Sequence, residues 1–460
     1  MILYFVFFQN TKMPLLDEIS EDCLAPFHQA NLPYIRDPKL RNPPSIVDLL
    51  KTMDYLGIAE IPWHVLSRVK KMSLKIFKTH FNEHQWVYKE VMDFRQWVKE
   101  TEESKLACTA ARKNKLEWLK WARDRGYSWD KSTCSYAASG GHLEIIKWAR
   151  EQGCPWNEYT CEAAAGGGHL EILKWVREQK CPWDDDTCSA AAENGHLEIL
   201  KWAHEQGCPW DVCTCAAAGE QGYLEILKWA YEHGCPWNED TCAFAANRGG
   251  HLEIIKWAHE HECPWDEKTC SNAAYWGHFE ILKWAHEHGC PWDRETCSSA
   301  AEAGHFEILK WVRERDCPWD GLTCNSAAYS GHLEVLQWTL DNDCPWDTSL
   351  CYSAASGGQL EILKWLRQQD YPWDEYTCTC AAETGHFEIL EWAHQQGCPW
   401  DCRTTDAALS NHHIDIFKWA IENGCPVNCN SCTLRLCTNP PQLEAIQWVK
   451  DNGYNVGEKK

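Results

Sequence analysis

From residue 101 onward, apolar and polar positions recur along the chain with a period of 27 residues. Trp following Lys, Glu or Gln marks the period at 121, 148, 175, 202, 229, 257, 284, 311, 338, 365, 392, 419 and 448, with one spacing of 28 and a final one of 29. Self-similarity at such a period indicates an array of supersecondary units. We therefore predict about thirteen copies of one unit.

A single copy, residues 183–209, shows the elements that the pattern predicts. Asp184 is a good N-cap for a first helix, in which Ala190, Ala191 and Ala192 favour helical structure. Gly195 supplies a left-handed stop, His196 begins a second helix, and Gly207 ends it. Each unit is thus expected to be helix, tight turn, helix, tight turn.

The second helix of each unit has a wide apolar face. In the copy after His142, this face covers an arc of roughly 220° at about 100° per residue, and its members are Leu143, Ile145, Ile146, Trp148 and Ala149. An isolated helix pair cannot bury such a face, whereas stacking on neighbours at both sides can. Because no strand-like alternation recurs, we predict an all-α solenoid.

The unit resembles the ankyrin repeat. The matching positions are Thr187-Cys188, Ala191-Ala192, Gly195-His196, Ile199-Leu200 and Gly207-Cys208. The family repeat has about 33 residues, and most of the shortfall lies after the second helix, where the β-hairpin finger is reduced to Cys-Pro-Trp-Asp. The short Trp- and Cys-rich unit is similar to ankyrin proteins of large nucleocytoplasmic DNA viruses. The resemblance implies a non-enzymatic protein-binding scaffold.

The chain is expected to divide into four parts. Residues 1–12 read as a tail or upstream extension, 101–430 as the repeat array, and 431–460 as a C-terminal capping repeat. Residues 13–100 do not repeat, and we interpret them as a helical cap for the first repeat. The stretch 46–58 resembles part of BTB/POZ and Skp1-like domains, so a degenerate BTB-like or F-box-like module that recruits a ubiquitin ligase remains the alternative.

Cysteine and tryptophan are unusually frequent, with 28 and 29 residues, and most follow the period. Cys pairs spaced by seven are too far apart for the usual structural zinc pairs, so we interpret them as small buried free thiols. A denser C-terminal group leaves a metal site or regulatory disulfide as an alternative, and it comprises Cys425, Cys429, Cys432 and Cys437. No cofactor is expected.

The positions that differ between copies are the candidates for a binding site. They lie in the first helix, which in ankyrin proteins lines the concave side, and those we select as partner-binding are Tyr136, Phe244, Arg248, Tyr275, Trp276, Tyr329 and Tyr352. Exposed aromatic and Arg side chains dominate binding energy at protein interfaces. Tyr275-Trp276 is the best single anchor.

Charge shapes the expected partners. The net charge is -23, and residues 101–460 account for -24 of it (31 Lys/Arg against 55 Asp/Glu). We expect a monomer that binds basic or host proteins, or a ubiquitin-ligase component, and neither nucleic acid nor membrane. No stretch reads as a signal peptide or bilayer-spanning segment, which favours a cytoplasmic location, in the host cytoplasm if the chain is viral.

Overall fold

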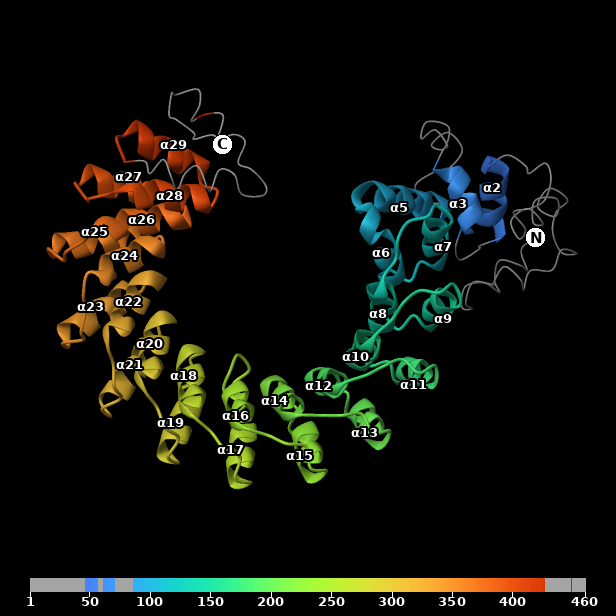
Figure 1. The fold of residues 1–460 in the computed structure, drawn as a ribbon. Coiled ribbons are helices and arrows are strands. Elements are labelled where there is room, and N and C mark those ends of the chain that lie inside the picture. Colours follow the sequence, from blue (N-terminus) through green and yellow to red (C-terminus); the bar gives the residue numbers. More distant parts are fainter. Residues whose placement is uncertain (1–45, 57–60, 71–85, 427–447, 449–460) are drawn as a thin grey trace, which may run out of the picture. The chain divides into compact units, whose positions relative to one another are not determined.

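The computed structural model describes residues 46–56, 61–70, 86–426 and 448 (Figure 1). Within these ranges there are 27 α-helices, one short 3-10 helix and no strand, so the predicted all-α array without β-hairpin fingers is confirmed. In this part of the chain no helix is long and apolar enough to cross a membrane. The chain forms two compact units, residues 1–214 and 215–460.

Unit 1 begins with three helices that precede the repeats and continues with helix pairs. The first three are α2 (Ile46–Leu56), α3 (Trp63–Val69) and α5 (Trp86–Glu100), and the 3-10 helix follows at Glu103–Lys105. The pairs are α6 (Leu106–Arg112) with α7 (Leu116–Asp124), α8 (Lys131–Ser139) with α9 (Leu143–Glu151), α10 (Glu158–Gly166) with α11 (Leu170–Glu178), and α12 (Asp185–Glu193) with α13 (Leu197–Glu205). Helix α14 (Val212–Gln221) contains the boundary between the units.

Unit 2 repeats the same pairing. After α15 (Leu224–Glu232) come α16 (Glu239–Ala245) with α17 (Leu252–Glu260), α18 (Glu267–Tyr275) with α19 (Phe279–Glu287), α20 (Arg294–Glu302) with α21 (Phe306–Arg313), and α22 (Gly321–Ser330) with α23 (Leu333–Asp341). Then follow α24 (Ser349–Ser356) with α25 (Leu360–Gln368), α26 (Glu375–Thr384) with α27 (Phe387–Gln395), and α28 (Cys402–Ser410) with α29 (Ile414–Glu422). In each unit, first helices of neighbouring repeats lie side by side (Figure 1).

Local sequence sets the ends of these helices as predicted. Asp130 caps α8, since its Oδ1 accepts a hydrogen bond from the Ser132 backbone N–H at 3.0 Å. Gly195 and Gly207 adopt φ of +79° and +78° after α12 and α13. His196 is the N-cap residue of α13. The predicted helix–turn–helix–turn unit is therefore confirmed in this copy.

The core of a repeat is made from small side chains of the first helix and branched ones of the second. In one repeat these are Thr133, Cys134, Ala137 and Ala138 of α8, with Ile145, Ile146 and Ala149 of α9. The second-helix Trp148 is only half-buried, and its ring packs edge-on against the loop Trp129 at 5.9 Å. The apolar face of the second helix therefore lies partly in the core of the repeat and partly against tryptophans outside that core.

Cysteines of the loops join the repeats through their thiols. The Cys154 Sγ donates to the backbone carbonyl of Asp130 at 3.5 Å, and Cys181 makes the same bond to Asn157 at 3.4 Å. The pKa of these loop thiols is raised, first by a hydrogen bond to the first-helix cysteine of the same repeat and then by burial. Among the described cysteines all are free, and all are buried except Cys213, Cys380 and Cys402. The interpretation as buried free thiols is confirmed for the rest.

In several repeats a histidine after the first turn links the repeat to the preceding one. The His169 Nε2 lies 3.1 Å from the Ser139 carbonyl oxygen, and His278 Nε2 lies 2.9 Å from that of Asn247. The same imidazoles lie against the left-handed glycine of the preceding turn, where a Cβ on Gly141 would come 2.7 Å from the His169 ring. Glycine is thus required there by contact as well as by backbone conformation.

The helices that precede the repeats pack on the first repeat of unit 1. Phe94 of α5 contacts Trp121 of α7 edge-on at 5.1 Å. Glu90, only 6% exposed, accepts hydrogen bonds from Trp118 Nε1 at 3.0 Å and from Lys115 Nζ at 2.8 Å. The open side of the first repeat is therefore covered by an aromatic cluster with a buried, fully used carboxylate.

Candidate protein-binding surface

The seven partner-binding residues selected from sequence fall in both units, and three of them come together. Tyr275 and Trp276 contact each other with ring centroids 5.3 Å apart, and the Arg248 guanidinium lies 5.6 Å from the Trp276 ring. Tyr275 and Trp276 are each 37% exposed. Phe244, which lies on the preceding first helix, is 38% exposed. We call Phe244, Arg248, Tyr275 and Trp276 the central patch.

One extra residue in the chain builds this patch. The spacing of 28 between Trp229 and Trp257 places an additional residue in the turn after α16, which ends early at Ala245. His251 N–H still bonds to the Ala245 carbonyl at 2.8 Å, whereas His142 N–H makes the equivalent bond to Ala137 one residue nearer. The turn absorbs the insertion, and Arg248 within it is placed beside the next repeat.

Polar contacts hold the lengthened turn against the following repeat. Because Asn247 N–H bonds to Phe244 at 3.0 Å, the carbonyl of Ala243 has no partner within the helix and instead accepts a hydrogen bond from Asn272 Nδ2 at 2.8 Å. Asn247 Nδ2 in turn donates to Glu220 Oε1 at 3.3 Å. The patch is therefore displayed on a backbone fixed from both sides, which lowers the entropic cost of binding.

The other selected residues lie apart from the central patch. Tyr136 lies on α8 of unit 1, 44% exposed, with the Arg112 guanidinium 5.9 Å from its ring. Tyr329 on α22 is 50% exposed. Tyr352 on α24 is only half-buried and contacts Tyr376 at 6.3 Å. These three add scattered aromatic surface to first helices rather than extending one continuous cluster.

Sequence reasoning missed three exposed apolar residues on first helices. They occupy the position two residues after the N-cap and are Tyr159, Leu322 and Tyr376, each 46–50% exposed. Lys131 and Arg403 lie over the rings of Tyr159 and Tyr376 at 5.2 Å and 4.3 Å. The signal was present in the sequence, since this position otherwise carries small or charged residues.

In unit 1 the first helices carry carboxylates that repel one another. The pKa of Glu162 on α10 is raised, first by burial and then by the charges of Asp186 and Asp184. Asp184 has a raised pKa as well, through burial and then Asp186. Carboxylates on α10 and at the start of α12 therefore lie close enough together to raise one another's pKa.

The described part of the C-terminal cysteine group does not support the alternative of a metal site. Cys429, Cys432 and Cys437 lie outside the described residues. Cys425 is buried, its Sγ donates to the Asp401 carbonyl at 3.3 Å, and burial raises its pKa to about 12. In the described ranges no three His, Cys, Asp or Glu side chains are grouped so as to hold a metal ion.

One family of known proteins matches a part of the chain. The ankyrin-repeat family, described as ankyrin repeats (many copies), matches residues 324–367. No curated protein sequence matches the chain. These findings support an ankyrin-repeat protein. The match does not include residues 46–58, so their resemblance to BTB/POZ and Skp1-like domains stays a prediction, as does a viral origin.

Solved structures that match are helical repeat proteins with low similarity. Two structures of the pentatricopeptide repeat protein PPR10, in complex with an 18-nt psaJ RNA element, are 13% identical over 85% of this chain and 68% of theirs, with a TM-score of 0.35. The human ASB11 ankyrin repeat domain is 16% identical over 34% of this chain and 84% of its own, with a TM-score of 0.29.

The prediction that nucleic acid is excluded as a partner is wrong. The finding that contradicts it is the match to PPR10, a helical repeat protein solved in complex with RNA. Net charge was also too coarse a criterion, because residues 101–130 carry 7 Lys/Arg against 5 Asp/Glu within an acidic array. At a TM-score of 0.35 the likeness says nothing about RNA binding by this chain.

Proposed function

We propose that this chain is a non-enzymatic scaffold that binds a partner protein on the first-helix surface of unit 2, with the central patch as its anchor. Ankyrin repeats support a protein-interaction role in general. The observation that carries the finer proposal is the cluster of Arg248, Tyr275 and Trp276, because exposed Trp, Tyr and Arg on a fixed backbone are the residue types that dominate interface energies.

The ring contacts within the central patch favour binding of a partner protein, because they fix the orientation of the aromatic side chains. Arg248 covers one part of the Trp276 ring at 5.6 Å, and the edge-on Tyr275 limits its movement. An incoming side chain therefore meets two oriented rings that have few rotamers left to lose. Burying both rings contributes favourable free energy with little ordering cost.

The experiment is affinity capture from the native cell followed by direct titration of each captured protein. Tyr275→Ala/Trp276→Ala should lose the partner, with an affinity reduced roughly a hundredfold if both rings act as hot spots. Phe387→Ala is the matched control, because it removes a 39% exposed ring from the start of the second helix α27. Retention of every partner by the double variant would refute the anchor.

A further inference from the structure

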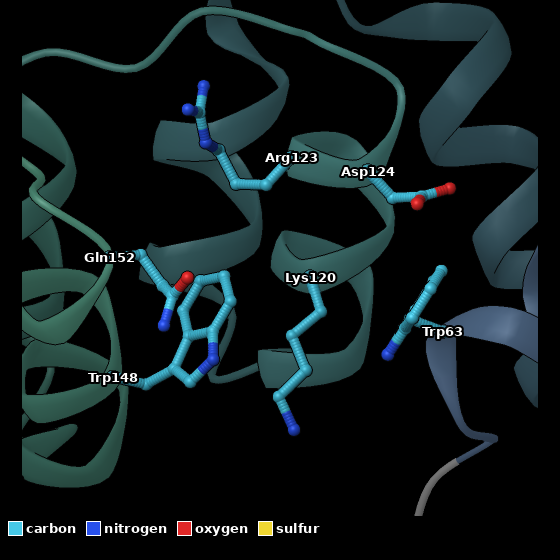
Figure 2. Close-up of a pocket in the computed structure, with 6 residues that line it drawn as sticks. All are labelled: Trp63, Lys120, Arg123, Asp124, Trp148 and Gln152. Atoms are coloured by element: carbon cyan, nitrogen blue, oxygen red, sulfur yellow. The ribbon is translucent and has the colours of Figure 1, made fainter. Parts of the chain in front are cut away.

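A cavity of about 410 Å³ lies in unit 1 where α3 meets the second helices of the first two repeats, on different helices from the central patch. It is lined by Trp63, Lys120, Arg123, Asp124, Trp148 and Gln152. Figure 2 shows the Lys120 side chain lying between the indoles of Trp63 and Trp148. The volume falls in the range of small-molecule sites, roughly 300–1,000 Å³.

Two lining residues distinguish this place from the corresponding place in the next repeat, namely Trp63 and Asp124, whose position is occupied there by Glu151. Lys120, Arg123, Trp148 and Gln152 recur 27 residues later as Lys147, Arg150, Trp175 and Gln179. Trp63 has no counterpart, since it comes from α3, outside the array. The helix α3 therefore adds an indole on the side of the pocket away from Trp148.

The low exposure of the Lys120–Glu117 ion pair shows how closely α3 covers the first repeat. The Glu117 side chain is 16% exposed, whereas Glu144 in the next repeat is 78% exposed. Glu117 uses both oxygens, accepting from Lys120 Nζ at 2.6 Å and from the Trp63 backbone N–H at 2.6 Å. Lys120 is 27% exposed and, with three ammonium donors, retains capacity for a ligand.

The other walls are held in place before any ligand arrives. Trp148 packs edge-on against Trp129 at 5.9 Å, and the Arg123 guanidinium stacks on the same Trp129 at 4.0 Å. Arg123 also donates to the Tyr127 carbonyl at 2.7 Å, and its guanidinium points away from the Lys120 ammonium (Figure 2). Lys120, which is paired with Glu117, is therefore the cation that lies between the two indoles, and Asp124 adds a carboxylate to the lining.

We propose that this pocket binds a small planar aromatic carboxylate, with its ring between Trp63 and Trp148 and its carboxylate on the Lys120 ammonium. Indole walls favour a flat aromatic group through offset or edge contacts. A carboxylate on a partly buried ammonium makes a charge-assisted hydrogen bond, roughly twice as strong as a neutral one.

Three probes that share one ring and differ in charge test the proposal on the full chain by calorimetry: indole-3-acetate, indole-3-acetamide and tryptamine. We expect indole-3-acetate to bind, indole-3-acetamide to bind roughly tenfold more weakly, and tryptamine more weakly still. Equal binding of the three, tightest binding of tryptamine, or no binding of indole-3-acetate would each overturn the proposal without any variant.

Variants then locate the site. Lys120→Gln should reduce the affinity for indole-3-acetate to that for the amide, Lys120→Arg should restore most of it, and Trp63→Ala should weaken all three probes. The matched control is Lys147→Gln, which removes the equivalent cation from a groove that α3 does not close. If Lys147→Gln lowers the affinity for indole-3-acetate as much as Lys120→Gln does, the probe binds the repeats in general and this pocket is not its site.

Discussion

At the scale of single residues, glycine is favoured at two positions of a repeat for different physical reasons. The glycine after the second helix is replaced in several repeats by residues that keep a positive φ, namely Lys180, Glu262, Asp316, Asp343 and Asp370. The glycine after the first helix is replaced only by Asn114 and His412, in the first and last such turns of the described array. In most repeats the histidine of the following repeat lies against this turn, as His169 does against Gly141, which favours glycine there.

Substitution of two glycines that share a backbone conformation should separate these causes. Gly277 and Gly289 have φ of +78° and +85°, so alanine at either should cost about 1 kcal/mol in backbone strain. A Cβ on Gly277 would come 2.8 Å from the His305 ring, but nothing lies within 4 Å of one on Gly289. We expect Gly277→Ala to cost about 1–3 kcal/mol more.

The measurement is thermal unfolding together with hydrogen exchange of α18 to α21. Exchange is needed because a repeat array does not unfold as a single two-state system. Equal effects of Gly277→Ala and Gly289→Ala would show that the histidine contact adds nothing and that only the backbone conformation matters.

A second prediction concerns acid. The His286 ring stacks on Trp292 with centroids 3.7 Å apart, and its pKa is lowered, first by burial and then by Arg315. The folded chain therefore binds this proton less readily than the unfolded chain, so the contribution to stability is present above about pH 6.5 and is lost as pH falls. His286→Gln should make the melting temperature less sensitive to acidification between pH 7.5 and 5.5.

A companion variant tests the cause of this shift. Arg315→Gln removes the neighbouring charge and should bring the pKa of His286 closer to its ordinary value, which NMR titration of the imidazole would report. The effect on stability should be small, because the ring is only partly buried and its charge interactions are screened. An unchanged pKa in Arg315→Gln would assign the whole shift to burial.

The third prediction is that native thiols react unequally. Cys213 is the exposed cysteine of the described set, and its pKa is raised, first by partial burial and then by Asp211. In the described ranges, a short iodoacetamide pulse followed by peptide mass spectrometry should label Cys213 before the buried cysteines. Because the thiolate reacts, Asp211→Asn should accelerate labelling, and Asn occupies the same capping position at Asn157 and Asn238.

At the scale of helices and turns, most of the repeat could be predicted from sequence. Asp184 at the N-cap position, the left-handed Gly195 and the start at His196 follow from local rules and lie where predicted, but the Asp184 side chain makes no capping hydrogen bond. The surplus of Trp and Cys was correctly assigned to packing. Its form was not predicted, because a thiol bonding to a carbonyl 24 residues earlier, as Cys154 does to Asp130, depends on how repeats stack.

The candidate surface was predictable in its members but not in its arrangement. Sequence selected Arg248, Tyr275 and Trp276 as separate variable positions. Their clustering depends on the shortened α16 and on the Asn272 bond to Ala243, a contact across repeats that no local pattern encodes. The 28-residue spacing was the one visible sign of this irregularity. The pocket at Trp63 was missed for the same reason, since α3 lies outside the period.

At the scale of the whole molecule, stability should be local in origin, because each repeat contacts only its neighbours. We interpret α5 as a cap for the first repeat, on which it places Phe94 fully buried against Trp121. The interpretation competes with a docking module for ubiquitin ligase. A cap must stabilise the helices it covers, whereas an independent docking module joined by a linker need not.

Phe94→Ala distinguishes these alternatives without deleting any of the chain. Removing a buried phenylalanine should cost about 3–5 kcal/mol where it packs. If α5 is a cap, hydrogen exchange should accelerate in α5, α6 and α7 and remain unchanged in α20 to α23, since coupling decays along an array. Tyr329→Ala, which removes a ring that is 50% exposed, is the control and should change neither region. Faster exchange confined to α5 would refute the cap interpretation, because the first repeat would then fold without support from that helix.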